Sequence, residues 1–475
     1  MTTADYDLVV IGSGPGGYTG AIRAAQLGLR VACVEKTPKL GGTCLLVGCI
    51  PSKTLLEATE KFILARDHYS RMGIRCQNVS MDLPTLMGRK DKVVDTLSNG
   101  IAGLFKKNKV ERLTGTAEFL GANQLKITGP AGEKTISTKN VLIATGSVPI
   151  ELPNFKFNSQ NVISSDEAIA LKTVPQRMTV IGAGSIGLEL SSVWQRLGTK
   201  VTVLEMTPGM LPGADDEMRR LMERTLRDQG IEFYFNAQAT GLKTEDGKLQ
   251  IGFISKDPAA RPDAKLGETF LPADIVLVAV GRRAFTEGLR AREIGVKTDE
   301  RGRIIVNHAW ETSTPNVFAI GDVISGPMLA HKAEEEAIAA VEIMAGKAGH
   351  VNYDTIPSVV YTAPELAWVG KTEEQLKQTG TAYKIGKFRF TANARAQCMD
   401  ETQGMVKILA DAHDDRVLGV HILGPQASSL IAEAVTAMEL GASSEDIART
   451  CHAHPSLPEA IREAALGVEG RTINS

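Results

Sequence analysis

The sequence predicts an α/β fold in which two nucleotide-binding units of the same design are followed by a C-terminal α+β domain. Three observations predict this arrangement. A strand, a glycine-rich turn, a helix and a second strand follow one another near the N-terminus, the same pattern returns 170 residues later, and the pattern changes beyond about residue 347. At 475 residues, the chain is long enough to form several domains.

The first unit has the residues that a Rossmann-like dinucleotide site requires. Gly12 allows a tight turn after the first strand, Gly14 lets a pyrophosphate approach the backbone, and Gly17 lets the helix pack closely on the strand. The second strand, residues 31–35, ends in Glu35, whose carboxylate can accept hydrogen bonds from ribose hydroxyls. We therefore expect a dinucleotide here, with its phosphates at the helix N-terminus.

The second unit repeats the order of strand, glycine-rich turn, helix and strand, and its residues indicate which nucleotide it binds. Its second strand ends in Glu205, and its glycine fingerprint comprises Gly182, Gly184, Ser185, Ile186 and Gly187. The acid at residue 205 would repel a 2′-phosphate, and the turn at residues 206–209 has no arginine to bind one. NAD is therefore favoured over NADP.

Three further apolar strands lead into glycines, at residues 141–146, 275–281 and 317–322. We expect the first two to leave the two nucleotide-binding units. The third precedes a helix that should begin near Met328.

The tail has a different character. Strands at residues 406–409 and 417–422 and helices from about residue 427 indicate a separate α+β domain. The expected domains are residues 1–148, 149–273, 274–346 and 347–475. The third of these should complete the first nucleotide site.

Composition excludes several classes of partner. Lysine plus arginine (53) nearly balances aspartate plus glutamate (55), and the formal net charge is −2, so no strong field points to nucleic acid or an anionic membrane. The N-terminus does not resemble a signal peptide, and no uncharged apolar run is long enough to span a bilayer.

Two cysteines five residues apart, Cys44 and Cys49, stand in a glycine-rich run after the first fingerprint. A zinc site needs about four ligands, and no second close cysteine pair exists. An inert buried pair is an alternative, although the glycines indicate a tight loop and residues 51–52 the start of a helix. A thiolate at such a helix end would be stabilised by the helix dipole. We favour a redox-active disulfide.

Four other cysteines occur singly, and we expect them to be buried hydrophobic residues: Cys33, Cys76, Cys398 and Cys451. This usage indicates a reducing compartment, in which a disulfide is more often catalytic than structural.

A third cluster lies near the C-terminus, at residues 451–459. His454 precedes Pro455, which favours an extended conformation, and Pro458 suits a new helix start. A histidine with a carboxylate nearby can form an oriented general base, but a loop histidine more often has a surface or packing role, so both interpretations stay open. A zinc site at His452 and His454 lacks further ligands, and we expect no metal.

Together these motifs resemble those of the flavoprotein disulfide reductases, and within that family those of the branch that oxidises dihydrolipoyl groups with NAD⁺. The resemblance covers almost the whole chain. It includes, in order, the first fingerprint, residues 42–44, 49–53, 144–147, 182–189, Glu205, 281–282, 321–322, 328–333 and 454–459. It implies two Rossmann-like domains, for FAD and NAD, and a C-terminal α+β dimerisation domain.

The resemblance implies one FAD per subunit, bound tightly without a covalent link, and NAD⁺/NADH as an exchangeable co-substrate. FAD would be held by Gly12, Gly14, Gly17, Glu35, Lys53, Gly115, Asp322 and Ala330. NAD would be held by Gly182, Gly184, Ser185, Ile186, Gly187, Glu205, Ala239 and Gly281. Lys53 and Glu189 resemble a pair near the reactive edge of the flavin. The remaining cofactor-binding candidates are Thr145, Gly146, Ser147, Arg282, Met328, Leu329 and His331.

The resemblance also implies catalytic roles. Cys49 would be the sulfur next to the flavin, and Cys44 the one that exchanges with substrate. His454 would be the base and Glu459 its orienting carboxylate, and this pair would act on the disulfide of the other subunit, so an obligate homodimer is implied. His452 lacks the five-residue spacing to Glu459.

The implied reaction is oxidation of protein-bound dihydrolipoamide to lipoamide with reduction of NAD⁺. The implied partners are lipoyl domains or a lipoyl carrier protein of 2-oxo acid dehydrogenase or glycine cleavage complexes, in the cytoplasm or, for a mature eukaryotic form, the mitochondrial matrix. Leu46 replaces an asparagine that is usual in the family, with no assigned consequence.

Three alternatives are disfavoured. An NADPH-dependent reductase of the glutathione reductase type conflicts with Glu205. A mercuric reductase conflicts with a tail that lacks a second cysteine pair. A redox-inactive assembly subunit conflicts with the intact cysteines, His454 and Glu459.

Overall fold

The computed structural model describes residues 4–245, 248–255 and 268–474. Contacts divide the chain into two compact units, each assembled from three stretches of sequence. The first comprises Met1–Leu55, Asp82–Ile150 and Gly281–Val351, and the second comprises Leu56–Met81, Glu151–Val280 and Asn352–Ser475. The four finer domains stay a prediction. None of the described helices is long and apolar enough to cross a membrane.

The first unit is built on a parallel sheet in the order β3–β2–β1–β6–β17. Its strands are β1 (Tyr6–Ile11), β2 (Val31–Glu35), β3 (Glu111–Thr114), β6 (Gly132–Ile143) and β17 (Val317–Ala319). The first half of β6 also pairs with the antiparallel hairpin β4 (Thr116–Gly121) and β5 (Gln124–Gly129). Leu8, Val9 and Val10 are fully buried, as expected for a central strand that is covered on both faces.

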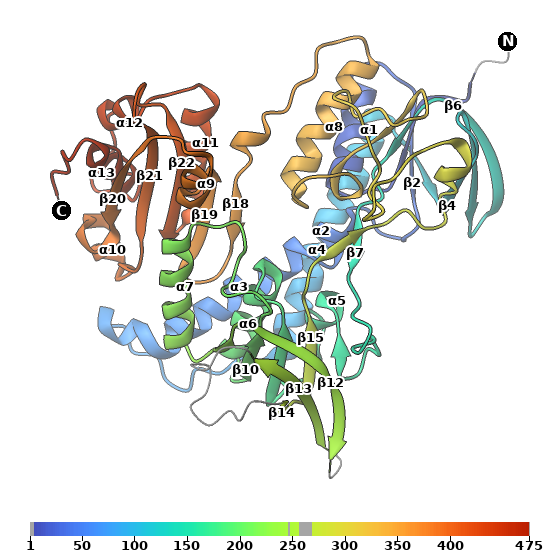
Figure 1. Cartoon of the computed structure of the whole chain (residues 1–475). Coiled ribbons are helices and arrows are strands. Elements are labelled where there is room, and N and C mark those ends of the chain that lie inside the picture. Colours follow the sequence, from blue (N-terminus) through green and yellow to red (C-terminus); the bar gives the residue numbers. More distant parts are fainter. Residues whose placement is uncertain (1–3, 246–247, 256–267, 475) are drawn as a thin grey trace. The chain divides into compact units, whose positions relative to one another are not determined.

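Helix α1 (Pro15–Gln26) packs against both this sheet and α8 (Ala330–Met344), as Figure 1 shows. Small residues make the approach close. A Cβ at Gly16 would lie 2.9 Å from the Ala333 carbonyl oxygen, and one at Gly20 would lie 3.0 Å from Leu142 Cδ2. The unit also contains α2 (Gly42–Leu46), the start of α3 (Cys49–Ile63), α4 (Leu83–Asn108), and the paired strands β7 (Ser147–Pro149) and β16 (Arg282–Ala284).

The second unit contains a parallel sheet in the order β11–β10–β9–β15–β8. Its strands are β8 (Val162–Ile163), β9 (Arg177–Ile181), β10 (Lys200–Leu204), β11 (Glu232–Tyr234) and β15 (Ile275–Val278). An antiparallel sheet accompanies it, made of β12 (Ala237–Glu245), β13 (Lys248–Ser255) and β14 (Thr269–Pro272). The helices of this part are α5 (Ser165–Ala168), α6 (Ser185–Arg196) and α7 (Asp216–Asp228).

The same unit contains an antiparallel sheet in the order β18–β19–β22–β21–β20. Its strands are β18 (Ser358–Val360), β19 (Glu365–Gly370), β20 (Tyr383–Arg389), β21 (Met405–Asp411) and β22 (Val417–Gly424). Its helices are α9 (Glu373–Thr379), α10 (Ala394–Met399), α11 (Ala427–Glu439), α12 (Ser444–Arg449) and α13 (Glu459–Val468). Helix α13 reaches the backbone of β20, because a Cβ at Gly386 would lie 1.9 Å from the Ala464 carbonyl oxygen.

Most elements predicted from the sequence are confirmed. Helix α1 begins at Pro15 and α6 at Ser185, at the predicted offset of 170 residues. The predicted strand at 141–146 is the end of the longer strand β6, whose first half has exposed positions and pairs with β5. The tail strands β21 and β22 and the helix from Ala427 are also found where predicted.

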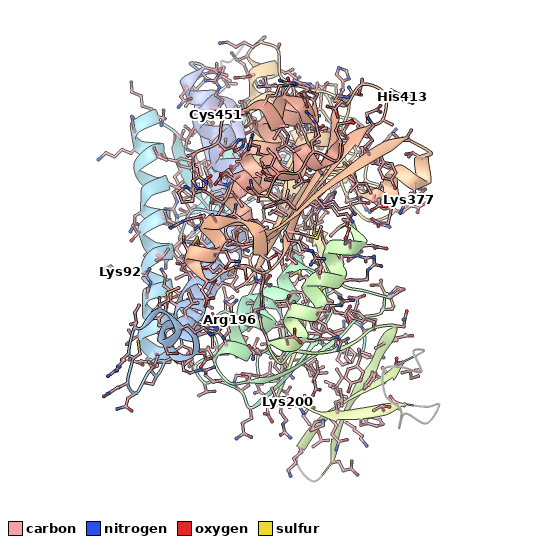
Figure 2. All side chains as sticks on the ribbon, turned by 90° about the vertical axis from the view of Figure 1, so that its left-hand side faces the viewer. Lys92, Arg196, Lys200, Lys377, His413 and Cys451 are labelled. Atoms are coloured by element: carbon pink, nitrogen blue, oxygen red, sulfur yellow. The ribbon has the colours of Figure 1, made fainter. Side chains whose placement is uncertain are left out.

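The expectation that the four single cysteines are buried is wrong for three of them. Cys33 lies on the central part of β2 and is fully buried. Cys76, Cys398 and Cys451 are exposed, because they lie on an irregular segment, on the short helix α10 and just after α12; Figure 2 labels Cys451.

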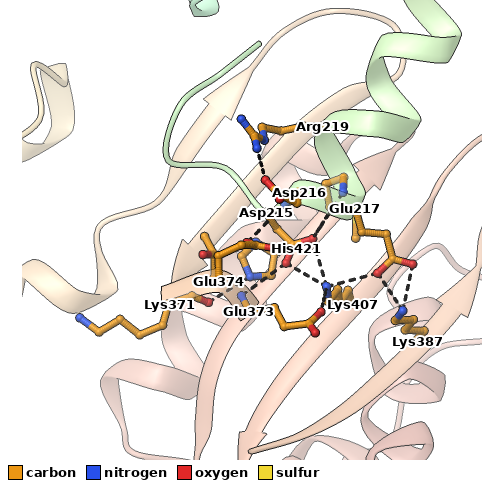
Figure 3. A network of polar contacts seen from close by, with 12 residues as sticks. Asp215, Asp216, Glu217, Arg219, Lys371, Glu373, Glu374, Lys387, Lys407 and His421 are labelled. Atoms are coloured by element: carbon orange, nitrogen blue, oxygen red, sulfur yellow. Dashed lines mark hydrogen bonds and ion pairs between the residues drawn. The ribbon is translucent and has the colours of Figure 1, made fainter. Parts of the chain in front are cut away.

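A buried lysine holds the second unit together (Figure 3). Lys407 on β21 has no exposed surface, and its Nζ lies 2.9 Å from Asp215 Oδ2, 2.6 Å from Glu373 Oε2 and 3.2 Å from Glu217 Oε2. Asp215 is the N-cap of α7 and Glu373 begins α9. Burial alone would lower the pKa of Lys407, but the hydrogen bonds to Glu373 and Asp215 outweigh it and raise that pKa. One ammonium thus joins two helices to the sheet.

His421 lies opposite Lys407 on the neighbouring strand β22 and is fully buried. Its Nε2 lies 3.1 Å from the Lys371 carbonyl oxygen, which can only accept, so Nε2 carries the proton. Its Nδ1 has no hydrogen-bond partner among the described residues. Burial lowers the pKa of His421 to about 4, although Asp215 acts against it, so the ring is neutral in the folded protein at neutral pH.

We expect stability to fall as the pH is lowered from about 6.5 toward 4, because the unfolded chain binds a proton on His421 in this range and the folded chain does not. The difference between a pKa near 6.5 and one of about 4 corresponds to roughly 3 kcal/mol. Urea midpoints of the purified protein at the two ends of this range measure the loss. His421→Gln should reduce it, whereas His413→Gln, at an exposed histidine, should not. An unchanged loss in His421→Gln would refute the assignment.

Candidate active site

Two short helices position the paired cysteines. Cys44 lies in α2, Cys49 is the first residue of α3, and both are half-buried thiols that are not joined in a disulfide. The hydrogen bond with Cys49 raises the pKa of the Cys44 thiol most; burial and Glu334 raise it further, while Lys53 acts in the opposite direction. The two sulfurs therefore lie within reach of each other, as a redox pair requires.

The loop that carries the cysteines packs directly on the first glycine fingerprint. The Gly41 amide donates to the Ser13 carbonyl oxygen at 3.0 Å. A Cβ at Gly42 would lie 2.5 Å from the Cα of Gly14, and Gly42 has a φ of +58°. Only glycine meets both demands, so residues 41 and 42 fix the dithiol next to the turn that would face a dinucleotide pyrophosphate.

Helix α3 begins two residues earlier than predicted, at Cys49 rather than Pro51. Its first turn therefore includes the second cysteine itself. The sulfur of Cys49 therefore lies at the positive end of the helix dipole.

A tyrosine–glutamate pair beside the cysteines was not predicted. Tyr18 on α1 donates its hydroxyl to Glu334 Oε1 on α8 at 3.0 Å. Burial raises the pKa of Tyr18, Glu334 raises it further, and Cys44 and Cys49 contribute as well. The two residues are 316 positions apart in the sequence, so only the packing of α1 on α8 brings them to the dithiol.

The first fingerprint has the close contacts that its glycines predict. A Cβ at Gly17 would lie 1.9 Å from the Gly12 carbonyl oxygen, and one at Gly12, where φ is +102°, would lie 2.5 Å from the Ala144 oxygen. Gly14 is the N-cap of α1. The backbone thus presents a helix N-terminus without side chains in front of it, which fits the pyrophosphate of FAD.

Glu35 and Glu205 are held by equivalent hydrogen bonds in the two units. Glu35 Oε2 accepts from the Ser13 amide at 3.0 Å, and Oε1 accepts from the Thr37 amide at 2.8 Å. Glu205 Oε2 accepts from the Ala183 amide at 2.8 Å, and Oε1 from the Thr207 amide at 2.7 Å. Each carboxylate is therefore fixed at its fingerprint, as a ribose acceptor must be.

The second fingerprint is open in front of its central glycine. A Cβ at Gly184 would meet nothing within 4 Å, so a nucleotide pyrophosphate fits there. The residue after Glu205 is Met206, which is 71% exposed and carries no charge. Arg219 does approach the following turn, but it donates to the Met210 oxygen at 3.2 Å and pairs with Asp216. The positive charge that a 2′-phosphate needs is thus already neutralised.

Several other predicted cofactor residues come together in the first unit. Ser147 donates to Asp322 Oδ2 at 2.5 Å, and Arg282 Nε donates to Ser147 Oγ at 2.8 Å. The loop that holds Asp322 contacts the buried ion pair Lys332–Glu336. Lys332 Nζ lies 3.0 Å from Glu336 Oε1. Glu336 accepts from the Gly321 amide at 2.8 Å. This pair was not predicted. A lysine and a glutamate four residues apart in a predicted helix are the sequence signal that could have found it.

The remaining predicted cofactor residues are spread over the two units. In the first unit, Gly115 donates to the Glu35 carbonyl oxygen at 2.9 Å, and Thr145 donates to the Phe285 oxygen at 2.6 Å. Also in this unit are Lys53, Gly146, Gly281, Met328, Leu329, Ala330 and His331. In the second unit, Glu189 accepts from the Tyr361 amide at 3.0 Å and Ala239 lies on β12. Their roles stay predictions.

The C-terminal histidine and glutamate form a pair. His454 Nδ1 lies 2.9 Å from Glu459 Oε1, and Glu459 Oε2 accepts from the Ser456 amide at 2.8 Å. Burial acts to raise the pKa of Glu459, but these two hydrogen bonds outweigh it and lower that pKa, so the carboxylate is ionised. Because Nδ1–H donates to the carboxylate, Nε2 is free to accept a proton. The His454 side chain is 72% exposed in the single chain.

His452 has a different environment. Its side chain is only 6% exposed, Nε2 lies 2.8 Å from Glu433 Oε1, and Nδ1 lies 2.8 Å from the Thr450 oxygen. Both ring nitrogens are therefore occupied, which suits a packing role. Among the described residues there is no group of three or more histidine, cysteine, aspartate or glutamate side chains that could hold a metal.

Comparison with protein families places the chain. The family model of the pyridine nucleotide-disulphide oxidoreductases matches residues 6–337, and the model of their dimerisation domain matches residues 356–465. The chain belongs to this family. The resemblance to flavoprotein disulfide reductases is thereby confirmed, and the dimerisation domain supports a homodimer.

Several relatives match nearly the whole chain. The chain is 48% identical over 469 residues to the mitochondrial dihydrolipoyl dehydrogenase of Pisum sativum, covering 98% of this chain and 92% of the relative. It is 50% identical over 477 residues to the mitochondrial dihydrolipoyl dehydrogenase of Homo sapiens, covering 99% and 92%. A Glycine max relative named leghemoglobin reductase is 48% identical over 461 residues, covering 97% and 87%.

Solved structures agree on the fold. The HOCl-induced flavoprotein disulfide reductase RclA of Escherichia coli superposes with a TM-score of 0.84 at 26% identity, covering 97% of this chain and 99% of that one. LpdA of Mycobacterium tuberculosis superposes with a TM-score of 0.88 at 24% identity, covering 96% and 98%.

We expect Glu459→Gln to lower kcat for dithiol-dependent reduction of NAD⁺ by about 10²-fold, because an amide no longer fixes the proton on His454 Nδ1. Flavin content should not change. Glu433→Gln makes the same chemical change at the other histidine–glutamate pair and should leave kcat near the wild-type value. Steady-state kinetics would contradict the assignment if Glu459→Gln retained full turnover or if both variants lost activity equally.

Proposed function

We propose that this protein is an NAD⁺-dependent dihydrolipoyl dehydrogenase, which oxidises protein-bound dihydrolipoamide to lipoamide through a redox disulfide and FAD. The observation that carries the proposal is the dithiol loop packed on the first fingerprint, together with a second fingerprint that ends in Glu205 beside an uncharged residue. Relatives named dihydrolipoyl dehydrogenase at 48–50% identity support it, and the family and these relatives use FAD and NAD(H).

The residues of the chain perform the thiol chemistry. His454 Nε2 takes a proton from one dihydrolipoyl thiol, and Glu459 holds the ring for this step. The resulting thiolate attacks Cys44 Sγ in the disulfide form, the Cys44–Cys49 bond breaks, and Cys49 leaves as a thiolate. The second substrate thiol then displaces Cys44, which releases the lipoyl disulfide and leaves a reduced dithiol. The chemistry that FAD supplies when bound is transfer of this electron pair to NAD⁺.

A homodimer completes the proposed site. The His454 side chain is largely exposed in the single chain, and it lies in the stretch matched by the dimerisation domain. We assign it to the dithiol of the partner subunit, so that each active centre combines the cysteines of one chain with the histidine of the other.

The proposed cofactor contacts follow from the two glycine fingerprints and the residues beside them. The first fingerprint, Glu35 and the Ser147–Asp322–Arg282 cluster would hold FAD. The second fingerprint and Glu205 would hold NAD. As part of this proposal, we assign Lys53 and Glu189 to the reactive edge of the flavin.

The proposed protein partners are lipoyl domains or a lipoyl carrier protein of a 2-oxo acid dehydrogenase or glycine cleavage complex. Relatives from pea and human are named mitochondrial, which supports the mitochondrial matrix over the cytoplasm. A reductase of the glutathione type is less well supported, because a 2′-phosphate would find the Glu205 carboxylate and a neutralised arginine.

The test crosses two nucleotides with two disulfides. NADH with lipoamide should give the highest kcat/KM, because the ribose acceptor at residue 205 repels a 2′-phosphate. NADPH with lipoamide and NADH with glutathione disulfide should each be slower by at least about 10²-fold. Activity only with NADPH and glutathione disulfide would overturn the proposal.

A further inference from the structure

A cavity of about 460 Å³ lies in the second unit, and no residue of either glycine fingerprint lines it. Side chains from α7, α9 and β20 line it, and its size is within the range of small-molecule sites. Its cationic lining residues are Arg220, Arg224, Lys377, Lys387 and Arg389. No step of the proposed reaction uses any of them.

Two of the three acidic residues that line this cavity, Glu217 and Glu373, are neutralised by lysines, whereas Glu374 forms no ion pair among the described residues. Glu217 pairs with Lys387 at 2.7 Å and with the buried Lys407 at 3.2 Å. Glu373 pairs with Lys377 at 2.5 Å and with Lys407 at 2.6 Å. The carboxylates of Glu217 and Glu373 thus offset the positive charges of Lys377 and Lys387.

The three arginines have no such partners. Among the described residues, no hydrogen bond or ion pair engages the side chain of Arg220, Arg224 or Arg389, and all three are exposed. Arg220 and Arg224 are one helical turn apart on α7, so both face the same side. Arg389 comes from β20, across the cavity lining. In a chain of net charge −2, three unpaired guanidinium groups thus gather around one cavity whose lining has a single unpaired carboxylate, Glu374.

The elements that carry these arginines are firmly held. Figure 3 shows Lys407 between the first turn of α7 and the first turn of α9, with Lys387 of β20 bound to Glu217 in the same network. Each cationic side chain therefore projects from a backbone whose position the buried network fixes. Binding a ligand would then have to order the side chains but not the backbone that carries them, which reduces the entropy that binding costs.

We propose that this cavity is a binding site for a small polyvalent anion that carries at least two phosphate groups. A guanidinium group offers a planar pair of donors that matches two oxygens of one phosphate. Three such groups on two elements exceed what a single phosphate can use, and they suit adjacent phosphates within one small molecule. A longer acidic peptide would extend beyond a cavity of this volume.

The test uses isothermal titration of the FAD-loaded enzyme with inorganic pyrophosphate at fixed ionic strength, because salt screens exposed charges. Saturating NAD⁺ keeps pyrophosphate away from the second fingerprint. We expect binding to persist in NAD⁺ and Kd to rise at least tenfold in Arg220→Gln/Arg224→Gln and severalfold in Arg389→Gln. The control Arg75→Gln/Arg89→Gln removes the same charge at two exposed arginines elsewhere and should bind as wild type. Lipoamide turnover should be unchanged in all variants.

Three results would overturn the proposal. The first is no binding at millimolar pyrophosphate, and the second is binding that NAD⁺ abolishes or that the control pair weakens equally. The third is tenfold tighter binding of a ten-residue polyglutamate at the same arginines, which would identify an acidic peptide as the ligand class.

Discussion

The contact between the backbones of Gly14 and Gly42 determines where the chemistry of this protein takes place. One glycine belongs to the first nucleotide fingerprint and the other to the loop of the two cysteines, and any side chain at residue 42 would collide with the fingerprint. The amide of Gly41 adds a hydrogen bond to the same turn. The dithiol, the fingerprint and the Glu35 carboxylate are thus parts of one rigid assembly. Electron transfer between thiols and a flavin needs this proximity, and no flexible element has to supply it.

The two nucleotide-binding units show how the same loop position acquired different roles. The Gly41 amide bonds to Ser13 in the first unit, and the Leu211 amide bonds to Ala183 in the second, both at 3.0 Å and 170 residues apart. In the first unit the chain then continues into the cysteine loop. In the second it continues to Asp215, which caps α7 and binds the buried Lys407. A shared scaffold therefore supports a redox loop in one copy and a structural anchor in the other.

Much of this could be predicted because glycine fingerprints and cysteine spacing are local patterns. The strands and helices around Gly12–Gly17 and Gly182–Gly187 are found where their sequence predicts them. His454 and Glu459 are five residues apart, and they form the hydrogen bond that this spacing was expected to allow. Tyr18–Glu334 and the cluster around Lys407 could not be predicted, because they join residues far apart in the sequence. The exposure of Cys398 and Cys451 was not predicted because the expectation used the average burial of cysteine in proteins. The exposure of an individual cysteine depends on the segment in which it lies.

The central claim is that electrons enter the protein through Cys44 and reach the flavin by way of the dithiol. The most direct measurement is flavin absorbance during anaerobic addition of dihydrolipoamide to the FAD-loaded enzyme, with Cys44→Ser beside the wild type. Dihydrolipoamide should change the flavin spectrum of the wild type and not that of Cys44→Ser, whereas NADH should reduce the flavin in both. Reduction of the flavin by dihydrolipoamide in Cys44→Ser at the wild-type rate would contradict the account.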